Sequence, residues 1–225
     1  MPEILFEDKF IIVCIKPSGV SSEQSDDGND MVSILSDYRA DKDEDDYIGV
    51  IHRLDKAVGG VMLYSKRNDT AAKLCAQVTD GRFQKEYIAV VEGKTEDSGE
   101  MDDLLYHDSQ KNKTYVVDRE RKGVRRASLE YETIGRTVLE SGKTLSAVRI
   151  RLKTGRTHQI RVQFASRKLP LLGDGKYGAS NSNVPIALWS EKISFVHPKS
   201  ERPVTFSKSP DTQKTPWSLL KDIKI

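Results

Sequence analysis

Short apolar runs separated by Gly, Pro, Asn and Asp recur along the chain, and three other stretches space their apolar residues as a helix does. Apolar runs bounded by turn residues are typical of strands. The predicted strands cover residues 4–6, 10–15, 60–65, 86–91, 113–118, 128–134, 144–153, 186–189, 192–196 and 204–206. The predicted helices cover residues 31–40, 69–78 and 156–167, the second with Asn68 as its N-cap. Because several strands follow one another without an intervening helix, we expect an α+β fold with a mixed, mainly antiparallel sheet flanked by helices.

Length and composition predict a single domain over residues 1–225. With 37% hydrophobic and 31% charged residues, the chain can bury one sizeable core and still present a polar surface. The longest early apolar run, residues 11–15, is followed by a Lys-Pro pair and is too short for a signal peptide or a membrane span. Cys14 and Cys75 fit no metal or redox spacing, so we expect two small buried side chains in a cytoplasmic protein.

Charge is divided unevenly along the sequence. Residues 23–46 hold ten acidic residues against two basic ones, so this segment carries a net charge of −8 and the rest of the chain +10. We expect an acidic, mostly solvated excursion on a basic body. A basic body favours a polyanionic partner such as a nucleic acid.

Several common kinds of site are not indicated. Residues 173–178 read GDGKYG and match the GxGxxG pattern of dinucleotide-binding folds. That pattern works only between a strand and a helix that begins inside it, and here it leads into ASNSN, which predicts a turn or loop. The four histidines form no recognisable ligand pair, and the GxSxG motif of serine hydrolases is absent from the sequence. We therefore expect neither a cofactor nor a metal.

One carboxylate occupies an unusual position. Asp55 lies in VIHRLDKAVGGVMLYSK, between two apolar runs that predict core strands. A buried carboxylate needs a cation and hydrogen bonds to offset the loss of water. Arg53 is the nearest candidate, and residues 147–161 offer five more cations without an acid, namely Arg149, Arg151, Lys153, Arg156 and Arg161. Strand alternation places the first three of these on one face. These facts alone leave open whether Asp55 is a nucleophile or one half of a structural ion pair.

Four blocks of sequence carry a family resemblance. They read HRLDK (52–56), FQKEYIAVVEG (83–93), LKTGRTHQIRVQFAS (152–166) and PLLGDGKYG (170–178). In this order and spacing they resemble the RluA-type RNA pseudouridine synthases, and the similarity begins at the KPSGV of residues 16–20. The resemblance implies an isomerase that converts uridine in RNA to pseudouridine without a metal or other cofactor. It also implies a single catalytic domain with an active-site cleft across the sheet.

The resemblance assigns roles to individual residues. Asp55 matches the essential aspartate, Arg161 the arginine that pairs with it, and Tyr87 the tyrosine that stacks on the target base. Arg53 matches an arginine that takes the place of the flipped uridine in the RNA stack, a role suited to a planar cation. We expect Arg149, Arg151, Lys153 and Arg156 to bind RNA, with residues 111–126 as a second phosphate-binding segment.

The chain departs from the family pattern in two places. Ala57, Val58 and Gly59 follow HRLDK where small hydroxyl residues are common, and Gln163 stands where a histidine is common. These differences put in doubt a hydroxyl contact near Asp55 and any role for a histidine in that helix. The family pattern begins within the first few residues, so we expect a form without an N-terminal accessory RNA-binding domain.

Three functions follow from these observations. The first is a monomeric pseudouridine synthase acting on a looped or hairpin segment of rRNA or tRNA, because regular A-form RNA hides its bases in a narrow groove. The second is a non-catalytic RNA-binding module of the same fold. The third is an aspartate-dependent nucleoside or nucleotide hydrolase, which the absence of a nucleotide-phosphate loop from the sequence disfavours. The presence of Asp55, Tyr87 and Arg161 together disfavours the second.

Overall fold

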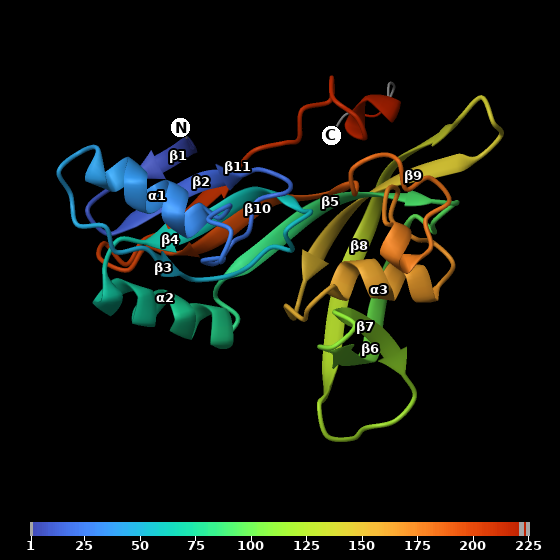
Figure 1. Cartoon of the computed structure of the whole chain (residues 1–225). Helices are drawn as coiled ribbons and strands as arrows, with labels where there is room; N and C mark the ends of the chain where they lie inside the picture. Colours follow the sequence, from blue (N-terminus) through green and yellow to red (C-terminus); the bar gives the residue numbers. More distant parts are fainter. Residues whose placement is uncertain (1, 221–222, 224–225) are drawn as a thin grey trace. The chain divides into compact units, whose positions relative to one another are not determined.

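The computed structural model of the protein describes residues 2–220 and 223. The chain divides into two compact units, shown in Figure 1. Unit 1 comprises Met1–Lys85 and Ser190–Ser209, and unit 2 comprises Glu86–Trp189 and Pro210–Ile225. Strands β5 (Gln84–Glu92) and β10 (Leu188–Val196) contribute residues to both units. The assignment of all 225 residues to one catalytic domain stays a prediction.

The sheet of unit 1 has the strand order β1-β2-β4-β10. Its members besides β10 are β1 (Glu3–Glu7), β2 (Ile11–Lys16) and β4 (Gly59–Ser65), with β3 (Gly49–Val50) beside β4 and β11 (Pro203–Ser207) beside β10. Every residue of β2 and β4 is buried. Such continuous apolar runs are typical of strands covered on both faces, and these two form the centre of the unit.

Two helices complete unit 1. Helix α1 (Met31–Ala40) has the predicted bounds, and its N-cap Asp30 accepts a hydrogen bond of 2.8 Å from the Ser33 N–H. Helix α2 (Asn68–Thr79) is also confirmed, but Arg67 occupies its N-cap position, so the prediction of Asn68 as the cap was wrong. Cys14 is buried as expected, whereas Cys75 is exposed on α2, contrary to the expectation of two buried thiols.

The sheet of unit 2 has the strand order β5-β9-β8-β6-β7. The remaining strands are β6 (Ser98–Asp108), β7 (Lys113–Val117), β8 (Val124–Val138) and β9 (Thr144–Leu152). Adjacent strands in this order pair antiparallel, which confirms the predicted sheet type. The sequence pattern missed β6 because only Met101 and Leu105 are buried in a run rich in acids. The predicted strands 186–189 and 192–196 form one strand, β10.

Helix α3 (Gln159–Ser166) lies beside β6 and β7 in unit 2, as Figure 1 shows. It begins three residues later than predicted, because His158 at its N-cap has a left-handed backbone with φ of 54°. On the α3 side of the sheet, the Phe164 ring packs at 5.4 Å from the Tyr131 ring. On the other side, Trp217 in the 3₁₀ turn η2 (Trp217–Leu219) packs in a cluster with Ile88 of β5.

None of the helices in residues 2–220 and 223 is long and apolar enough to cross a membrane.

Candidate active site

Asp55 lies in a turn of unit 1 that buried side chains hold in place. The Ser22 hydroxyl donates to the Leu54 carbonyl at 2.8 Å and accepts from the Leu54 N–H at 3.0 Å. The Val58 N–H donates to the Asp55 carbonyl at 2.9 Å and closes the turn just before β4. The Asp55 backbone is therefore fixed on both sides, while its side chain is only partly buried.

The buried side chain of His52 supports the same turn. Its Nε2 accepts a hydrogen bond of 3.1 Å from the Leu63 N–H of β4, and its ring packs 4.9 Å from that of Phe83. Burial, with a contribution from the charge of Lys85, lowers the pKa of His52 to about 3. The imidazole is therefore neutral at physiological pH, as it must be to accept this bond. His52 acts here as a structural anchor of the HRLDK segment.

A buried lysine lies close enough to Asp55 to feel its charge. Lys16 is 0% exposed, and its ammonium donates to the carbonyls of Pro17, Val20 and Lys56 at 2.9, 2.7 and 3.3 Å. Burial lowers the pKa of Lys16 to about 8, while the negative charge of Asp55 acts in the opposite direction. Lys16 thus supplies the buried positive charge that a carboxylate in this position needs. Sequence reasoning missed it, although a lysine that ends an apolar run was a signal.

Arg53 and Lys56, on either side of Asp55 in the sequence, both make ion pairs with the acidic excursion. Arg53 Nη1 lies 2.8 Å from Glu23 Oε2, and Lys56 Nζ lies 3.1 Å from Asp27 Oδ2. The structure therefore gives Glu23 as a partner of Arg53, the arginine that we considered nearest to Asp55. Hydrogen bonds from Ser25, the Asn29 N–H and Lys56 lower the pKa of Asp27 to about 2.

In unit 2, Arg161 forms a buried, bidentate ion pair with Asp174. Arg161 Nε donates to Oδ2 at 2.7 Å and Nη2 to Oδ1 at 2.9 Å, and the residues are 5% and 1% exposed. Pairing of Arg161 with Asp55, which the family resemblance implies, stays a prediction. Asp174 belongs to segment 173–178, which forms the 3₁₀ turn η1 (Gly175–Tyr177). The prediction of a turn there is confirmed, but the sequence did not reveal that this turn carries a partner of Arg161.

Tyr177 joins this pair to the start of α3. Its hydroxyl accepts from the Thr114 N–H at 2.8 Å and lies 2.9 Å from His158 Nδ1. The Arg161 guanidinium lies 5.2 Å from the centre of the Tyr177 ring, a cation–π distance. Burial raises the pKa of Tyr177, so its hydroxyl stays protonated at neutral pH. The network holds Arg161 in one orientation.

Strand register places Tyr87 on the same side of the unit 2 sheet as α3. Tyr87 lies opposite Ile150, which lies opposite Tyr131, and Tyr131 contacts Phe164 of α3. Side chains directly opposite each other in adjacent strands share a face. Tyr87 is 5% exposed. The two expected catalytic residues of this unit, Tyr87 and Arg161, therefore lie on one side of its sheet.

The expected RNA-binding cations Arg149 and Arg151 lie on the opposite face of that sheet. Arg149 is opposite Ile88, and Arg151 is opposite Glu86, to which it is paired at 3.2 Å. Strand alternation predicted this shared face, but glutamates interrupt the positive charge on it.

The other two expected RNA-binding cations lie beyond the end of β9. Lys153 pairs with Glu130 at 2.5 Å, and Arg156 Nε donates to the Arg126 carbonyl at 3.1 Å. Both side chains belong to exposed residues, so their long stems leave them accessible to a ligand.

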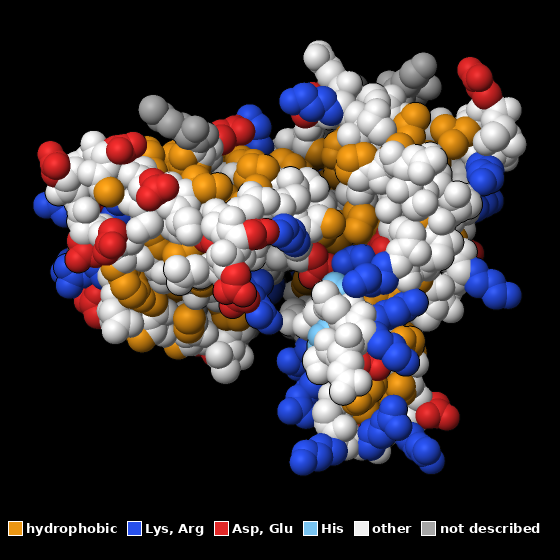
Figure 2. All heavy atoms as spheres, in the orientation of Figure 1, with side chains coloured by type: hydrophobic (Ala, Val, Ile, Leu, Met, Phe, Trp, Pro, Cys, Tyr) orange, Lys and Arg blue, Asp and Glu red, His pale blue; other side chains and the backbone are white. Residues whose placement is uncertain are grey.

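Positive charge is denser along residues 111–126, which we call the basic arm. It spans β7, the following loop and the start of β8, and Figure 2 shows Lys and Arg side chains gathered there. Its cations are Lys111, Lys113, Arg119, Arg121, Lys122, Arg125 and Arg126. The Arg121 guanidinium lies 4.8 Å from the centre of the Tyr106 ring, which orients it without neutralising its charge.

Gln163, at the position where the family pattern differs, is a core residue of unit 2. It is 0% exposed, and its Nε2 donates to Asp103 at 2.7 Å and to the Ala127 carbonyl at 3.3 Å. Asp103 also pairs with Arg167 at 2.9 Å. Gln163 therefore joins α3 to β6 and β8.

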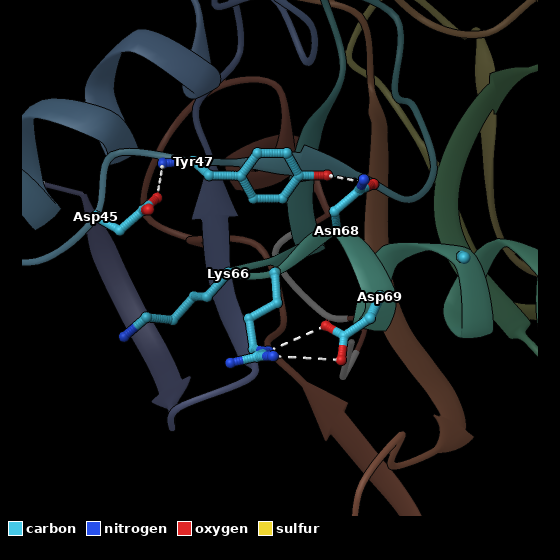
Figure 3. Close-up of a pocket in the computed structure, with 7 residues that line it drawn as sticks. Asp45, Tyr47, Lys66, Asn68 and Asp69 are labelled. Carbon is cyan, nitrogen blue, oxygen red and sulfur yellow. Dashed lines mark hydrogen bonds and ion pairs between the residues drawn. The ribbon is translucent and has the colours of Figure 1, made fainter.

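A surface pocket of about 750 Å³ lies elsewhere in unit 1, as Figure 3 shows. Its lining consists of Asp45, Tyr47, Lys66, Arg67, Asn68, Asp69 and Ala72. The charged groups in it already pair with one another or with neighbours, for example Arg67 with Asp69 at 3.0 Å. The pocket contains none of the catalytic or RNA-binding residues expected from the sequence.

Comparisons with known proteins find similar sequences and a similar fold. The family model described as RNA pseudouridylate synthase matches residues 10–166, which is more than half of the chain. An uncharacterized RNA pseudouridine synthase of Aquifex aeolicus is 32% identical over 97% of this chain and 73% of its own length. A ribosomal large subunit pseudouridine synthase D of Zymomonas mobilis is 32% identical over 91% of this chain and 68% of its own length.

Two further similarities concern length and fold. The tRNA pseudouridine synthase C of Haemophilus ducreyi is 28% identical over 97% of this chain and 93% of its own length. The solved structure of human RNA pseudouridylate synthase domain containing 1 superposes with a TM-score of 0.76 at 18% identity, covering 96% of this chain and 86% of that one. At this identity the structural match supports the fold alone. The family model and the sequence relatives show that the chain belongs to the RluA-type RNA pseudouridine synthases, isomerases that convert uridine in RNA to pseudouridine.

Proposed function

We propose that this protein isomerises one or more specific uridines in a looped or hairpin segment of rRNA or tRNA, with Asp55 as the essential carboxylate. The observation that carries the proposal is the built environment of Asp55. Buried side chains fix its turn, a fully buried lysine ammonium lies within electrostatic reach, and two exposed cations flank it. Relatives named for ribosomal large subunit RNA and for tRNA support these two substrate classes.

The reaction detaches the base from the sugar, turns it and rejoins it through carbon 5. An aspartate carboxylate is negatively charged at neutral pH and suits either attack on the reacting nucleotide or stabilisation of a cationic sugar. Asp55 serves in one of these two roles. The buried ammonium of Lys16 provides positive charge near this carboxylate.

Three further residues have proposed roles. Arg161 holds the geometry of Asp55 and is itself oriented by Asp174. Tyr87 stacks on the target base and assists proton transfer. Arg53 takes the place of the extruded uridine in the RNA stack and also binds a phosphate, since a planar guanidinium can do both, and this offsets part of the few kcal/mol that base flipping costs.

The phosphate contacts come from exposed cations outside this centre. We propose that Arg156 and the basic arm provide the main contacts to the RNA backbone, because they are exposed and add positive charge without base specificity. Arg149 and Arg151 share a face with glutamates, Lys153 pairs with Glu130, and we expect these three cations to contribute less. We also propose a cytoplasmic monomer, in keeping with two unpaired thiols and an RNA substrate.

The decisive experiment measures release of tritium from carbon 5 of uridine. RNA labelled at that position, from cells lacking this protein, is incubated with wild type, Asp55→Ala and Asp55→Asn. We expect wild type to release tritium to water, and both variants to release none while still binding RNA. The control Asp97→Asn removes an exposed carboxylate of unit 2 and should behave as wild type. Binding without release by wild type would instead favour the non-catalytic RNA-binding module.

A further inference from the structure

We infer that Glu23 and Asp27 are internal counter-ions that occupy the places of RNA phosphates at Arg53 and Lys56, and that they weaken the binding of any RNA that must displace them. The inference rests on the proposed function, because it concerns the two cations that flank Asp55. It assigns a role to the acidic excursion, which the sequence suggested was mostly solvated.

The contacts that suggest this are two ion pairs on the same turn. Arg53 Nη1 meets Glu23 at 2.8 Å and Lys56 Nζ meets Asp27 at 3.1 Å. All four side chains are at least half exposed, with exposed fractions between 51% and 62%. A carboxylate and a phosphate offer the same cation two oxygen acceptors of similar geometry. An RNA phosphate can therefore replace either acid.

The acids are held at these positions by a folded loop. Glu23 directly follows Ser22, which is bonded to Leu54 in both directions, so the chain that carries Glu23 is anchored beside Asp55. Asp27 Oδ1 accepts from the Ser25 hydroxyl at 2.6 Å and from the Asn29 N–H at 3.1 Å.

The far end of the loop is anchored as well. Asp30 is 0% exposed, and its carboxylate caps α1 at Ser33 N–H and accepts from the Ser25 N–H at 2.9 Å. A segment that was merely solvated would lack such anchors at both ends. The loop thus presents its two carboxylates at Arg53 and Lys56 in a defined geometry.

The strength of these pairs suits displacement. An exposed ion pair changes an equilibrium constant by no more than about fivefold and weakens as salt rises. Any RNA that approaches must exchange these acids for its phosphates and then tolerate the two displaced negative charges. This cost is paid by every RNA that engages the two cations. The acids therefore weaken RNA binding at this turn, and they do so most at low salt, where the ion pairs are strongest.

The test compares single substitutions that change charge equally. Glu23→Gln and Asp27→Asn remove the two pairs, and Asp26→Asn is the matched control, an exposed carboxylate of the same loop for which residues 2–220 and 223 provide no ion pair. The probe is a fluorescent 12-nucleotide oligouridine, with anisotropy measured at 50 and 300 mM KCl. We expect about two- to fivefold tighter binding for Glu23→Gln and for Asp27→Asn at 50 mM, little change at 300 mM, and a clearly smaller gain for Asp26→Asn.

A double-mutant cycle identifies the partner. In an Arg53→Gln background, Glu23→Gln should no longer tighten oligouridine binding beyond the Asp26→Asn control. Equal gains for Glu23→Gln and Asp26→Asn, or a gain that persists without Arg53, would mean that only net charge matters and would overturn the inference. Weaker binding by Glu23→Gln would overturn it as well.

These binding measurements do not depend on turnover, so they remain informative if wild type releases no tritium and the proposed function fails. Where wild type releases tritium, unlabelled oligouridine should inhibit the two variants more strongly than wild type. Its inhibition constant should fall by the same factor as its Kd. Melting curves confirm that each variant is folded before the comparison is made.

Discussion

The guanidinium of Arg161 is clamped by Asp174 through two hydrogen bonds, of 2.7 and 2.9 Å, at a position where both residues are almost completely buried. Removing one partner of a buried ion pair typically costs about 3–5 kcal/mol, because the other charge is left without full compensation. Arg161 is also the arginine expected to hold the catalytic aspartate. We therefore expect its orientation to affect catalysis as well as stability.

Asp174→Asn keeps the size of the side chain but removes its charge. We expect it to lower the free energy of unfolding by about 3 kcal/mol, and to lower kcat by tenfold or more while the KM for RNA changes less than threefold. Urea unfolding and tritium-release kinetics measure these effects. The control Asp97→Asn breaks an exposed pair with Arg136 and should leave the unfolding midpoint nearly unchanged. An unchanged kcat in a folded Asp174→Asn would contradict a role in positioning Arg161.

Gly60 is required by a close approach of two strands in unit 1. Its φ is +129°, and a Cβ there would lie 2.3 Å from the Ser190 carbonyl oxygen and 2.5 Å from its nitrogen. Because these are backbone atoms of β10, the clash cannot be relieved by a rotamer change. We expect Gly60→Ala to lower the free energy of unfolding by about 3 kcal/mol or more.

Gly81→Ala is the matched control for this substitution. Gly81 also has a positive φ, +81°, but a Cβ would meet nothing within 4 Å. Only the conformational cost of about 1–2 kcal/mol should remain, so urea unfolding should separate the two variants clearly. Equal losses would mean that the approach to Ser190 adds nothing.

Glu7 gives unit 1 a stability that depends on pH. Burial raises the pKa of Glu7, but hydrogen bonds from Lys42, Lys66 and Tyr38 together outweigh it and lower the pKa to about 2, from an ordinary 4.5. A carboxylate whose pKa is lower in the folded state stabilises the fold at any pH above its pKa in the unfolded chain. This stabilisation is lost as the pH falls from 4.5 toward 2.

We therefore expect Glu7→Gln to lower the free energy of unfolding by about 2 kcal/mol at pH 7 and by close to nothing at pH 2. The value at pH 7 is reduced to allow for the partial exposure of Lys42. Unfolding of both proteins at several pH values measures the difference. Glu3→Gln, which removes an exposed pair with Lys208, should show little pH dependence over the same range. A constant difference for Glu7→Gln at all pH values would rule out the ionic explanation.

The basic arm should contribute to RNA affinity without contributing to chemistry. Each cation that neutralises a phosphate adds about 0.7–0.9 to the slope of log K against log salt. Arg119→Gln and Lys122→Gln should each reduce that slope by about this amount and raise KM a fewfold, with kcat unchanged. Lys73→Gln, on the exposed side of α2, changes charge equally and should leave the slope unaltered. The same slope for all three variants would exclude the arm from the interface.

Much of the fold was predictable from local pattern. Helix α1 has its predicted bounds, and the runs that form β2 and β4 are apolar enough to indicate buried strands by themselves. The sequence pattern missed strand β6, because only some of its residues are buried and its exposed positions hold acidic residues. Acidic residues have a low propensity for strands, so the local pattern did not indicate one. Helix α3 was predicted too long, since His158 has a left-handed backbone that local preference does not predict, and its side chain lies 2.9 Å from the Tyr177 hydroxyl.

The sequence by itself determined the family, through four ordered blocks, and with it the expectation that Asp55, Tyr87 and Arg161 act together. It also determined that charge is split between an acidic segment and a basic body. Only the tertiary structure decided which charges meet. Lys16 near Asp55, Asp174 on Arg161, and Glu23 on Arg53 join positions that are 39, 13 and 30 residues apart in the chain. The reason is physical: hydrophobic periodicity specifies which face of an element is buried, whereas the partner of a charge depends on how the elements pack.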